Sequence, residues 1–324
     1  MTKKLYIAVD LGGTGTKCGI FTPSGKLISK SYFYTEPQKG AILYFKKLKN
    51  CIDVLLRKED LKKEYIEGIG MGSPGPLDVR NGIMLYSANF PGWKDVDFRA
   101  FFKENYNAPS YFENDVNLVA LGEYNLNFKD DYKYVIVLTL GTGLGGAYIE
   151  KGHVLHGKQG FAGEFGHIQV VENGIRCGCG SHGCLEAYVS ASGIKKRLFK
   201  LKKDKKMNKR FIKHLEDMTP KAVYKLAEEN NGYAIDFFKE TGYQLGKGLK
   251  TIVNIFNPDL LAIGGGMSDA LKYILPEAKH YLKKNAFKVM VENLDIEEIT
   301  FSEDSALYGG YLLVKNENRK LQNG

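Results

Sequence analysis

A succession of strands and glycine turns occurs twice in this sequence, and it limits the possible folds more than any other feature. Residues 5–10, LYIAVD, form a buried strand pattern that ends in an aspartate, followed by the turn LGGTGTK and strand-like runs at 18–21 and 26–33. From residue 134 the segments YVIVLTL, GTGLGG, AYIEKG and HVLHG repeat the order of strand, glycine turn, strand and strand. Two half-chains of similar plan predict two α/β domains that face one another, with the glycine turns lining the cleft.

Further segments complete each half. A helical pattern at 41–57 leads to the strand IEGIGMG, and a helix is expected to start near Asn114. In the second half a long helical pattern at 234–256 precedes the strand and glycine turn LLAIGGGMS, and another helix is expected from Ser268. This alternation of strands and helices is typical of α/β architecture.

The segment GTGLGG also fits the pattern G-x-G-x-x-G, which on its own would indicate a dinucleotide-binding fold. That fold needs a helix directly after the glycines, whereas residues 147–150 are β-prone and are followed by another glycine. The sequence contains no P-loop pattern. We therefore interpret both glycine turns as phosphate cradles between strands, where glycine lets backbone N–H groups approach an anion and threonine adds a hydroxyl donor.

Three of the five cysteines lie close together, in CGCGSHGCLE at 177–186. With 44% hydrophobic and 26% charged residues, no secretory signal and no apolar run of membrane-helix length, the chain is expected to be a globular cytoplasmic protein. Clustered cysteines in a reducing compartment indicate metal binding rather than disulfides, the alternative being three reduced cysteines without a metal. Three thiolates are one ligand short of a closed tetrahedral zinc site, so we expect the fourth ligand elsewhere in the chain.

The net charge of +9 is concentrated in one segment. Residues 195–213 hold eleven Lys and Arg side chains against Asp204 alone, and the remainder of the chain is near neutral. A basic run without interleaved aromatic pairs is typical of a solvated helix and loop, and the alternative is a surface for anions or nucleic acid. We expect a solvated excursion that takes no part in the chemistry and binds no nucleic acid.

Five motifs carry a family resemblance: DLGGTGTKCG at 10–19, ENDVNLVALGE at 113–123, LGTGLGGAYIEKG at 140–152, AGEFGH at 162–167 and CGCGSHGCLE at 177–186. In order and spacing they resemble the ROK family of sugar kinases and sugar-responsive repressors. The resemblance implies an α/β, two-domain actin-like ATPase fold, related to ribonuclease H, with an interdomain cleft for ATP and a hexose. We expect domains at 1–113 and 114–304, with a helix from about residue 305 packing back on the first.

The resemblance also implies the fourth zinc ligand, which in this family is the histidine of the E-x-G-H segment. The implied set is His167, Cys177, Cys179 and Cys184. His182 is an alternative, although closure of this tight loop around His182 together with its cysteine neighbours would be strained. A zinc ion with four protein ligands has a structural role, because no position remains for an activated water.

The family match assigns the chemistry to Asp115, in ENDVN, as the base that accepts the proton of the sugar hydroxyl. The alternative is that Asn114 and Asp115 simply cap a helix. A hexose is bound by carboxylates and amides that each contact neighbouring hydroxyls, and the zinc loop is expected to direct Glu186 toward the sugar beside Glu164. The expected sugar contacts are Asn89, Asn114, Asp115, Glu164, His167 and Glu186.

On the nucleotide side, Asp10 resembles the residue that organises Mg²⁺, and the two glycine turns together with a third glycine segment are expected to hold ATP. The expected contacts are Asp10, Gly12, Gly13, Thr14, Lys17, Thr142, Gly143, Gly264, Gly265 and Gly266. The last three are expected beneath the adenosine, where only glycine permits a close approach.

The sequence thus predicts in-line transfer of the ATP γ-phosphoryl group to a hexose hydroxyl, with O6 of glucose as the acceptor. Fructose, mannose, N-acetylmannosamine, N-acetylglucosamine and β-linked glucosides remain as alternative acceptors. A sugar-responsive repressor is the competing class, but repressors of the family carry an added N-terminal helix-turn-helix, and here the first strand starts at Leu5. The resemblance further implies a homodimer or higher homo-oligomer without a membrane partner.

Overall fold

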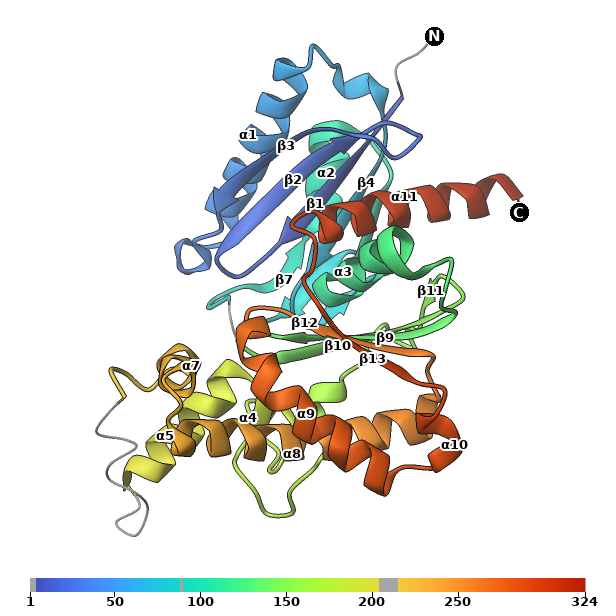
Figure 1. The fold of residues 1–324 in the computed structure, drawn as a ribbon. Helices are drawn as coiled ribbons and strands as arrows, with labels where there is room; N and C mark the ends of the chain where they lie inside the picture. Colours follow the sequence, from blue (N-terminus) through green and yellow to red (C-terminus); the bar gives the residue numbers. More distant parts are fainter. Residues whose placement is uncertain (1–3, 88–89, 204–214, 324) are drawn as a thin grey trace. The chain divides into compact units, whose positions relative to one another are not determined.

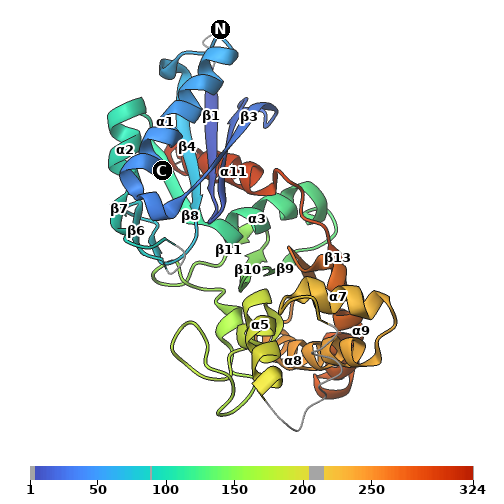
Figure 2. The ribbon, with the colours of Figure 1, turned by 90° about the vertical axis from the view of Figure 1, so that its left-hand side faces the viewer.

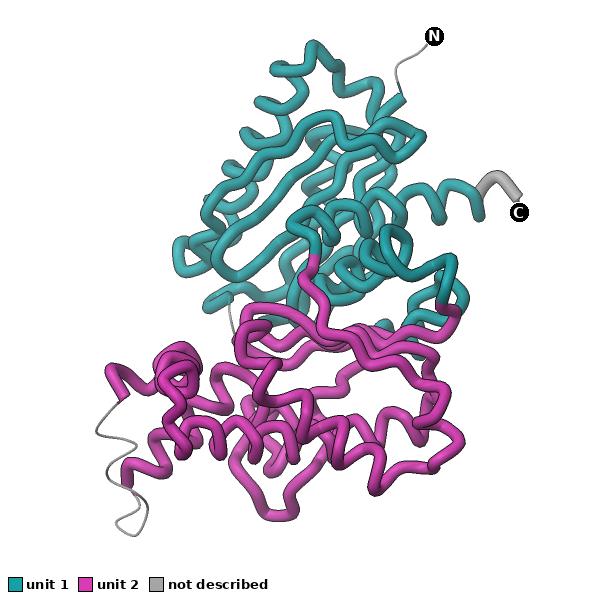
Figure 3. The backbone as a smooth tube through the Cα atoms, viewed as in Figure 1, with its two compact units in different colours: residues 1–131, 149–162, 302–324 teal, residues 132–148, 163–301 magenta. Residues whose placement is uncertain are grey.

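The computed structural model describes residues 4–87, 90–203 and 215–323 of the chain. The chain forms two compact units, shown in Figure 3: unit 1 comprises residues 1–131, 149–162 and 302–324, and unit 2 comprises residues 132–148 and 163–301. Unit 1 therefore gathers three separate segments of the chain. The division into actin-like domains at 1–113 and 114–304 remains a prediction.

Unit 1 is built on a five-stranded sheet with the strand order β3-β2-β1-β4-β8. The first three strands form an antiparallel meander, whereas β4 and β8 run parallel to β1. The predicted opening meander is confirmed, and β1 and β3 contain several of the β-branched and aromatic residues that favour extended backbone. The strands are β1 (Leu5–Leu11), β2 (Gly15–Phe21), β3 (Leu27–Tyr34), β4 (Ile66–Ser73) and β8 (Ser110–Asn114).

Helices cover this sheet, and Figure 2 shows α1 and α2 beside its strands. The helices α1 (Ala41–Lys58) and α2 (Phe98–Tyr106) pack their apolar residues into the larger hydrophobic core of unit 1. A small antiparallel sheet, with the order β5-β6-β7, precedes α2. Its strands are β5 (Leu77–Asp78), β6 (Ile83–Tyr86) and β7 (Lys94–Asp97), and the 3-10 turns of unit 1 are Pro37–Lys39 and Lys63–Tyr65.

The C-terminal helix α11 (Ser305–Asn323) packs on β1 and β4 within unit 1 and runs along α3 (Asp115–Glu123), as Figure 1 shows. The helix lies so close to β4 that glycine is required at the contact, because a Cβ atom on Gly70 would lie 2.1 Å from the carbonyl oxygen of Gly310. The buried carboxylate of Glu123 accepts hydrogen bonds from the N–H and hydroxyl groups at the start of α11. A π-helical turn, Tyr124–Phe128, continues α3.

Unit 2 contains most of a second sheet that repeats the first, with the order β11-β10-β9-β12-β13. The central strand is β9, and its neighbour β12 runs parallel both to β9 and to the outer strand β13. In unit 1, β4 runs parallel to β1 and β8 in the same way. The predicted internal repeat is therefore confirmed. The strands are β9 (Tyr134–Leu140), β10 (Leu144–Glu150), β11 (His153–Val154), β12 (Leu260–Gly264) and β13 (Asp295–Ile299), of which β11 and the end of β10 belong to unit 1.

The strand β10 starts three residues earlier than the sequence pattern indicates, because Leu144, Gly145 and Gly146 belong to the strand and not to the turn. Gly146 is needed there for close packing, since a Cβ atom on it would lie 2.5 Å from the ring of Phe165. Glycine in a strand often marks such an approach rather than a turn.

The helices of unit 2 share one hydrophobic core with its strands, and the long helix α8 packs lengthwise against α9. Both long helices were expected from the sequence, and the predicted starts lie within a few residues of the observed ones. The helices are α4 (Glu186–Val189), α5 (Ala191–Lys203), α7 (Pro220–Glu228), α8 (Gly232–Phe256), α9 (Ser268–Asn285) and α10 (Lys288–Val291). Among the described residues, no helix combines the length and the apolar character needed to cross a membrane.

The helix α5 contains the first part of the basic run, and residues 204–214 lie outside the described part. Its lysines are exposed, as expected for a solvated face. Arg197 is a correction to that expectation: its guanidinium donates to the carbonyl of Tyr188 and the hydroxyl of Thr241, and it lies over the ring of Phe237. Burial lowers the pKa of Arg197 to about 10. This side chain packs inward, because α5 is amphipathic and places position 197 between its apolar and polar faces.

Candidate active site and metal centre

The glycine turn of unit 1 connects β1 to β2 at residues 12–14. The N–H of Gly12 donates to the carbonyl of Gly15 at 3.0 Å, which closes the turn. Thr35, the residue after β3, holds the turn from the side: its hydroxyl donates to the Gly12 carbonyl at 2.7 Å and its N–H to the Thr14 carbonyl at 3.0 Å. Within the described residues, the N–H groups of Gly13 and Thr14 have no protein acceptor. Two adjacent N–H groups left open in this way suit an anion such as phosphate.

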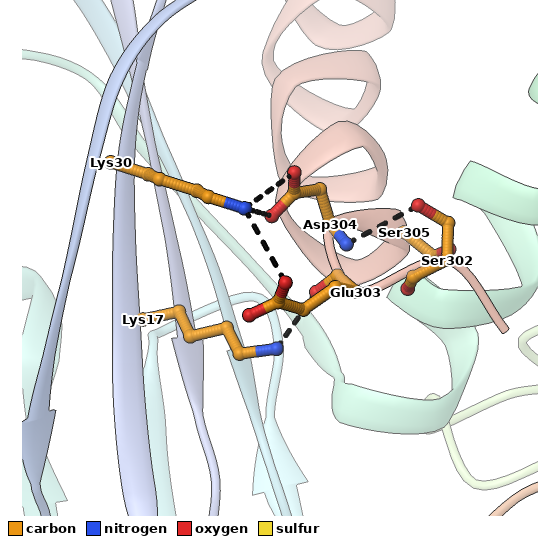
Figure 4. A network of polar contacts seen from close by, with 6 residues as sticks. All are labelled: Lys17, Lys30, Ser302, Glu303, Asp304 and Ser305. Atoms are coloured by element: carbon orange, nitrogen blue, oxygen red, sulfur yellow. Dashed lines mark hydrogen bonds and ion pairs between the residues drawn. The ribbon is translucent and has the colours of Figure 1, made fainter.

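Asp10 and Lys17 face each other across the β1–β2 ladder beside this turn. Burial raises the pKa of the Asp10 carboxyl, and the Lys17 ammonium opposes the shift. The Lys17 amine donates to the backbone carbonyl of Glu303 at 2.7 Å, and Lys30 forms an ion pair with Asp304 at 2.8 Å, as Figure 4 shows. Lys17 thus joins the predicted phosphate cradle to the segment that leads into α11.

The start of α3 places the predicted base. Asn114 is the N-cap, and its side-chain oxygen accepts the N–H of Val116 at 2.9 Å. Asp115 is the first residue of the helix, and its carboxylate also accepts the Val116 N–H, at 3.0 Å. Both residues are half-buried. The expected helix cap is therefore present, and it leaves the assigned role of Asp115 open, because a carboxylate at a helix N-terminus can do both.

A contact between a buried carboxylate and an exposed histidine next to Asp115 was not expected from the sequence. Glu113 is 2% exposed, and one carboxylate oxygen accepts the N–H of Asn114 at 2.8 Å and the amide of Asn117 at 2.9 Å. The other carboxylate oxygen lies 2.5 Å from Nε2 of His156, on the segment after β11. This hydrogen bond raises the pKa of His156. The pair connects the segment at 156 to the start of α3, directly before Asp115.

The glycine turn of unit 2 repeats the design at residues 141–143. The N–H of Gly141 donates to the carbonyl of Gly143, while the N–H groups of Thr142 and Gly143 have no protein acceptor within the described residues. The carbonyl groups of Gly141 and Thr142 accept the first N–H groups of α5, from Ala191 and Ser192, at 2.9 and 3.2 Å. The N-terminus of the basic helix α5 thus holds this turn in place.

In the third glycine segment, at 264–266, close packing within the protein requires two of the three glycines. A Cβ atom on Gly264 would lie 2.2 Å from the carbonyl oxygen of Ile299, and one on Gly265 would lie 2.6 Å from that of Leu140. Gly265 also has φ +116°, which side chains rarely adopt. Only at Gly266 does the protein leave the Cβ position open. Gly266 alone therefore fits the expectation of a glycine that leaves room for a ligand.

Unit 2 brings together the four side chains that the resemblance assigns to zinc. One ligand atom from each of His167, Cys177, Cys179 and Cys184 lies within 4.8 Å of the others. The Cys179 and Cys184 sulfurs are 3.7 Å apart, as are the Cys177 sulfur and Nδ1 of His167. A tetrahedral ion with bonds of about 2.0 to 2.3 Å places its ligand atoms roughly 3.5 to 3.8 Å apart, so the set fits zinc. His182 lies outside this cluster.

The cysteine cluster is connected to both glutamates expected at the sugar. The Nε2 atom of His167 lies 3.7 Å from the carboxylate of Glu164, while its Nδ1 atom faces the cysteines. Glu186 starts α4, and one of its carboxylate oxygens lies 3.6 Å from the Cys177 sulfur. Its other oxygen accepts the N–H of Leu144 at 3.0 Å, at the end of the unit 2 glycine turn. A metal in the cluster would therefore order Glu164 and Glu186 through their neighbours.

The structure thus gathers the predicted residues into two sets. Unit 1 holds Asp10, the turn at 12–14, Lys17, Asn114 and Asp115, and unit 2 holds the metal cluster, its two glutamates and the other two glycine segments. Asn89, the remaining expected sugar contact, lies outside the described residues. The residues that sequence reasoning missed are Thr35, Glu113 and His156. Glu113 is the first residue of the ENDVN motif and His156 lies in the HVLHG segment, whereas Thr35 carries no sequence signal beyond its place after a strand.

Comparison with known proteins places the chain in a family. The family model described as "ROK family" matches residues 6–317, nearly the whole chain. The chain belongs to the ROK family. It is 31% identical over 328 aligned residues to the glucokinase of Halalkalibacterium halodurans, an alignment that covers 100% of this chain and 99% of that one.

Solved ROK structures share the fold. The ROK hexokinase from Thermus thermophilus superimposes with a TM-score of 0.80 at 25% identity, covering 99% of this chain and 100% of that one. A ROK family glucokinase from Streptomyces griseus, in complex with glucose and AMPPNP, gives a TM-score of 0.74 at 26% identity, with 96% and 99% covered. The mixed α/β architecture with its repeated sheet is therefore the actin-like ATPase fold, as the motifs implied.

Relatives in the ROK family also include regulators. The DNA-binding transcriptional dual regulator NagC of Escherichia coli is 28% identical over 320 residues, which cover 98% of this chain and 76% of that protein. Overall similarity therefore does not separate kinases from repressors within the family, so residues of the site have to decide.

Proposed function

We propose that this protein is an ATP-dependent hexose kinase that transfers the γ-phosphoryl group to a sugar hydroxyl, and that the acceptor is O6 of glucose. The observation that carries the proposal is the placement of Asp115, a carboxylate on the first residue of α3 directly after β8. The full-length similarity to a glucokinase supports the reaction, and the glucose-bound ROK glucokinase supports the sugar.

On the acceptor side, Asp115 takes the proton from the sugar hydroxyl as the bond to phosphorus forms. A base must be held still to act in this way, and two contacts hold it. The Val116 N–H donates to the Asp115 carboxylate. The N–H of Asn114, the residue before Asp115, donates to the Glu113 carboxylate. Asn114, Glu164, His167 and Glu186 bind the remaining hydroxyls in this proposal, and Asn89 adds a further contact.

On the donor side, the open N–H groups of Gly13 and Thr14 in one turn, and of Thr142 and Gly143 in the other, bind phosphate oxygens. Lys17 adds a positive charge beside the first turn. Asp10 is a half-buried carboxylate at the end of β1 and fits a ligand for Mg²⁺, which binds nucleotides through one or two carboxylates and the phosphates themselves. When bound, the ion would neutralise phosphate charge; positioning by the protein supplies most of the remaining catalysis.

Zinc would be held by His167 and the three clustered cysteines, and its contribution is structural. With all four positions filled by protein, the ion would keep the loop at 177–184 in shape. That loop leads directly into Glu186. Loss of the ion is therefore expected to weaken sugar binding more than it changes the chemical step.

The test is an ADP-release assay with ATP and a panel of hexoses, followed by identification of the product. We expect turnover with glucose, formation of glucose 6-phosphate, and lower kcat/KM for fructose, mannose and the N-acetylated hexoses. Purified Asp115→Asn protein is the matched control, because it keeps the size of the side chain and one acceptor oxygen for the Val116 N–H but removes the base.

Two outcomes would contradict the proposal at different levels. Higher kcat/KM with another hexose would replace glucose and leave the kinase assignment in place. Absence of ADP release with every sugar, together with a mobility shift on DNA at moderate salt, would instead place the chain among the repressors.

A further inference from the structure

A cavity of about 700 Å³ lies over the outer edge of β8 in unit 1. This edge strand pairs only with β4 among the described strands, so its other side is open. The turn at 78–81, the segment at 156–161 and the helix α11 surround the opening. The two loops meet at Gly160, whose position beside Val79 leaves only 3.3 Å for a Cβ atom and whose φ is +87°. The cavity is thus built by unit 1 alone.

Cationic side chains outnumber carboxylates in the lining. Four fixed cations, Arg80, Arg99, Lys158 and Lys320, line the cavity together with three carboxylates. Among the described residues neither Arg80 nor Lys158 forms an ion pair. Arg80 lies near enough to Asp78 to help lower the pKa of that carboxyl, whereas Lys158 has no carboxylate partner among the described residues and is a favourable position for an anion.

The Arg99 guanidinium has N–H groups beyond those that bind the protein. Three of its N–H groups donate to the backbone carbonyls of Asn81, Ser110 and Arg80, and its guanidinium lies over the ring of Phe112. A guanidinium carries five N–H groups, so one on each terminal nitrogen is left without a protein acceptor within the described residues. Such a pair of neighbouring donors matches two oxygens of one phosphate or carboxylate group.

The carboxylates of the lining are already occupied by partners. Asp78 accepts from the backbone N–H groups of Arg80 and Asn81 and from the Asn81 amide. Glu113 is paired with His156, and Glu317 with Lys320 at 2.5 Å. The field that remains in the cavity is therefore positive, and no carboxylate is left to bind a cation in competition.

The lining is also aromatic, because Tyr111, Phe112 and Phe161 belong to it. The volume is within the range of pockets for small molecules and exceeds the need of a lone inorganic ion. Aromatic faces suit the C–H faces of a sugar ring, whereas the arginines and lysine suit a phosphate group.

We propose that this cavity is a second ligand site, which binds a phosphate monoester of monosaccharide size between Arg80, Arg99 and Lys158. Its lining includes neither the unit 1 glycine turn at 12–14 nor Asp115, but it includes Glu113 and His156 beside the start of α3. A bound anion accepts a hydrogen bond from His156, which lines the cavity, and so competes with Glu113 for it. Because Glu113 also holds the backbone of Asn114, occupancy of the cavity alters the support of Asp115 and lowers the turnover rate.

The experiment is a calorimetric titration of the full-length protein with glucose 6-phosphate, in the absence and in the presence of saturating glucose and AMPPNP. One binding equivalent is expected to persist when both substrates are present. Arg80→Gln/Lys158→Gln protein is expected to lose this equivalent with an affinity drop of about tenfold or more, while its kcat with glucose and ATP alone stays unchanged. Lys46→Gln/Arg57→Gln protein, with the same charge change at exposed positions of α1, is the control and is expected to keep it.

Three results would overturn the proposal. The first is the absence of any glucose 6-phosphate binding when the substrates are present, and the second is binding that is equal in the double variant and the control. The third is inorganic phosphate binding as tightly as glucose 6-phosphate, which would show that the cavity recognises an ion and not a sugar phosphate. Because the readout is binding, it is independent of whether glucose proves to be the acceptor.

Discussion

The two glycine turns share a backbone design but are held in different ways. In each, the first glycine N–H closes the turn and the next two N–H groups stay open. The turn of unit 1 is held by Thr35, which directly follows the neighbouring strand β3. The turn of unit 2 is held by the N-terminus of α5 and by Glu186, which follows the cysteine cluster. The first turn thus depends on its own meander, and the second depends on a loop that fits a metal.

The helices that follow the last strand of each sheet differ in the same manner. The helix α3 follows β8 and begins with Asp115, whereas α11 follows β13 and is preceded by Asp304. Asp304 is neutralised by Lys30. The repeated sheet therefore has two similar strand-to-helix junctions. The junction of β8 and α3 carries the proposed base, and the junction of β13 and α11 anchors the C-terminal helix.

The largest expected effect is a difference in activity between variants of these two aspartates. Asp115→Asn should lower kcat by about 10²- to 10⁴-fold, the range for loss of a general base, while glucose affinity stays nearly unchanged. Asp304→Asn removes the same charge from the other helix start and should leave kcat within about twofold. Kinetics and glucose calorimetry check both. Retention of more than about a tenth of kcat by Asp115→Asn would remove Asp115 from the base position.

Loss of the metal should disturb one glycine turn and spare the other. Cys179→Ser is expected to abolish zinc binding, lower Tm and raise the KM for glucose about tenfold, because Glu186 and His167 lose their support. Cys51→Ala, on α1 and outside the cluster, should keep one zinc per chain. Metal analysis and steady-state kinetics measure the difference. Zinc-free wild-type protein, purified without chelator, would contradict the assignment.

The unit 1 turn can be tested through the two lysines of Figure 4. Lys17→Gln should raise the KM for ATP about tenfold, since its charge lies beside Asp10 and the open N–H groups. Lys30→Gln breaks two surface ion pairs, with Glu303 and Asp304, and should change the KM for ATP by less than about twofold. Equal effects of both variants would mean that Lys17 acts only by anchoring Glu303.

The Glu113–His156 pair predicts a pH dependence of stability. Because Glu113 raises the pKa of His156 in the folded protein, the pair stabilises fully below the unfolded pKa of about 6.5. That stabilisation is lost as pH rises through the raised folded pKa. The Tm advantage of wild type over His156→Asn should therefore be largest at low pH and shrink toward high pH. His153→Asn, at an exposed position nearby, should show no such trend.

The smallest effect is expected from the basic helix that holds the second turn. Changing Lys195, Lys200, Lys202 and Lys203 together to Gln should leave kcat/KM for ATP within about threefold, because exposed charges are screened within roughly 8 to 10 Å at physiological salt. Arg197→Gln, in contrast, removes a buried donor and should lower Tm. A tenfold or larger fall in the lysine variant that disappears at high salt would show that this helix attracts the nucleotide.

Much of the frame could be predicted from local patterns, because strand alternation, helical periodicity and glycine turns leave signals within a few residues. Strand starts were less certain: Gly15 and Gly145 resemble turn residues, yet both belong to strands. The Glu113–His156 pair could not be predicted, since its members are separated by 43 residues and meet only after the sheet forms. The inward position of Arg197 could not be predicted either, because neighbouring lysines make it resemble part of a solvated basic run and its partner Thr241 is distant in sequence.

The C-terminal segment gives the molecule an order of assembly during synthesis. Residues 302–324 complete unit 1, whereas every residue of unit 2 has been made before them. When the last residue of unit 2 has been added, unit 1 therefore still lacks the helix that covers Ala8 and Phe21. A chain that stops before Leu307 would expose this apolar face of the first sheet, although all 306 residues before it were translated correctly.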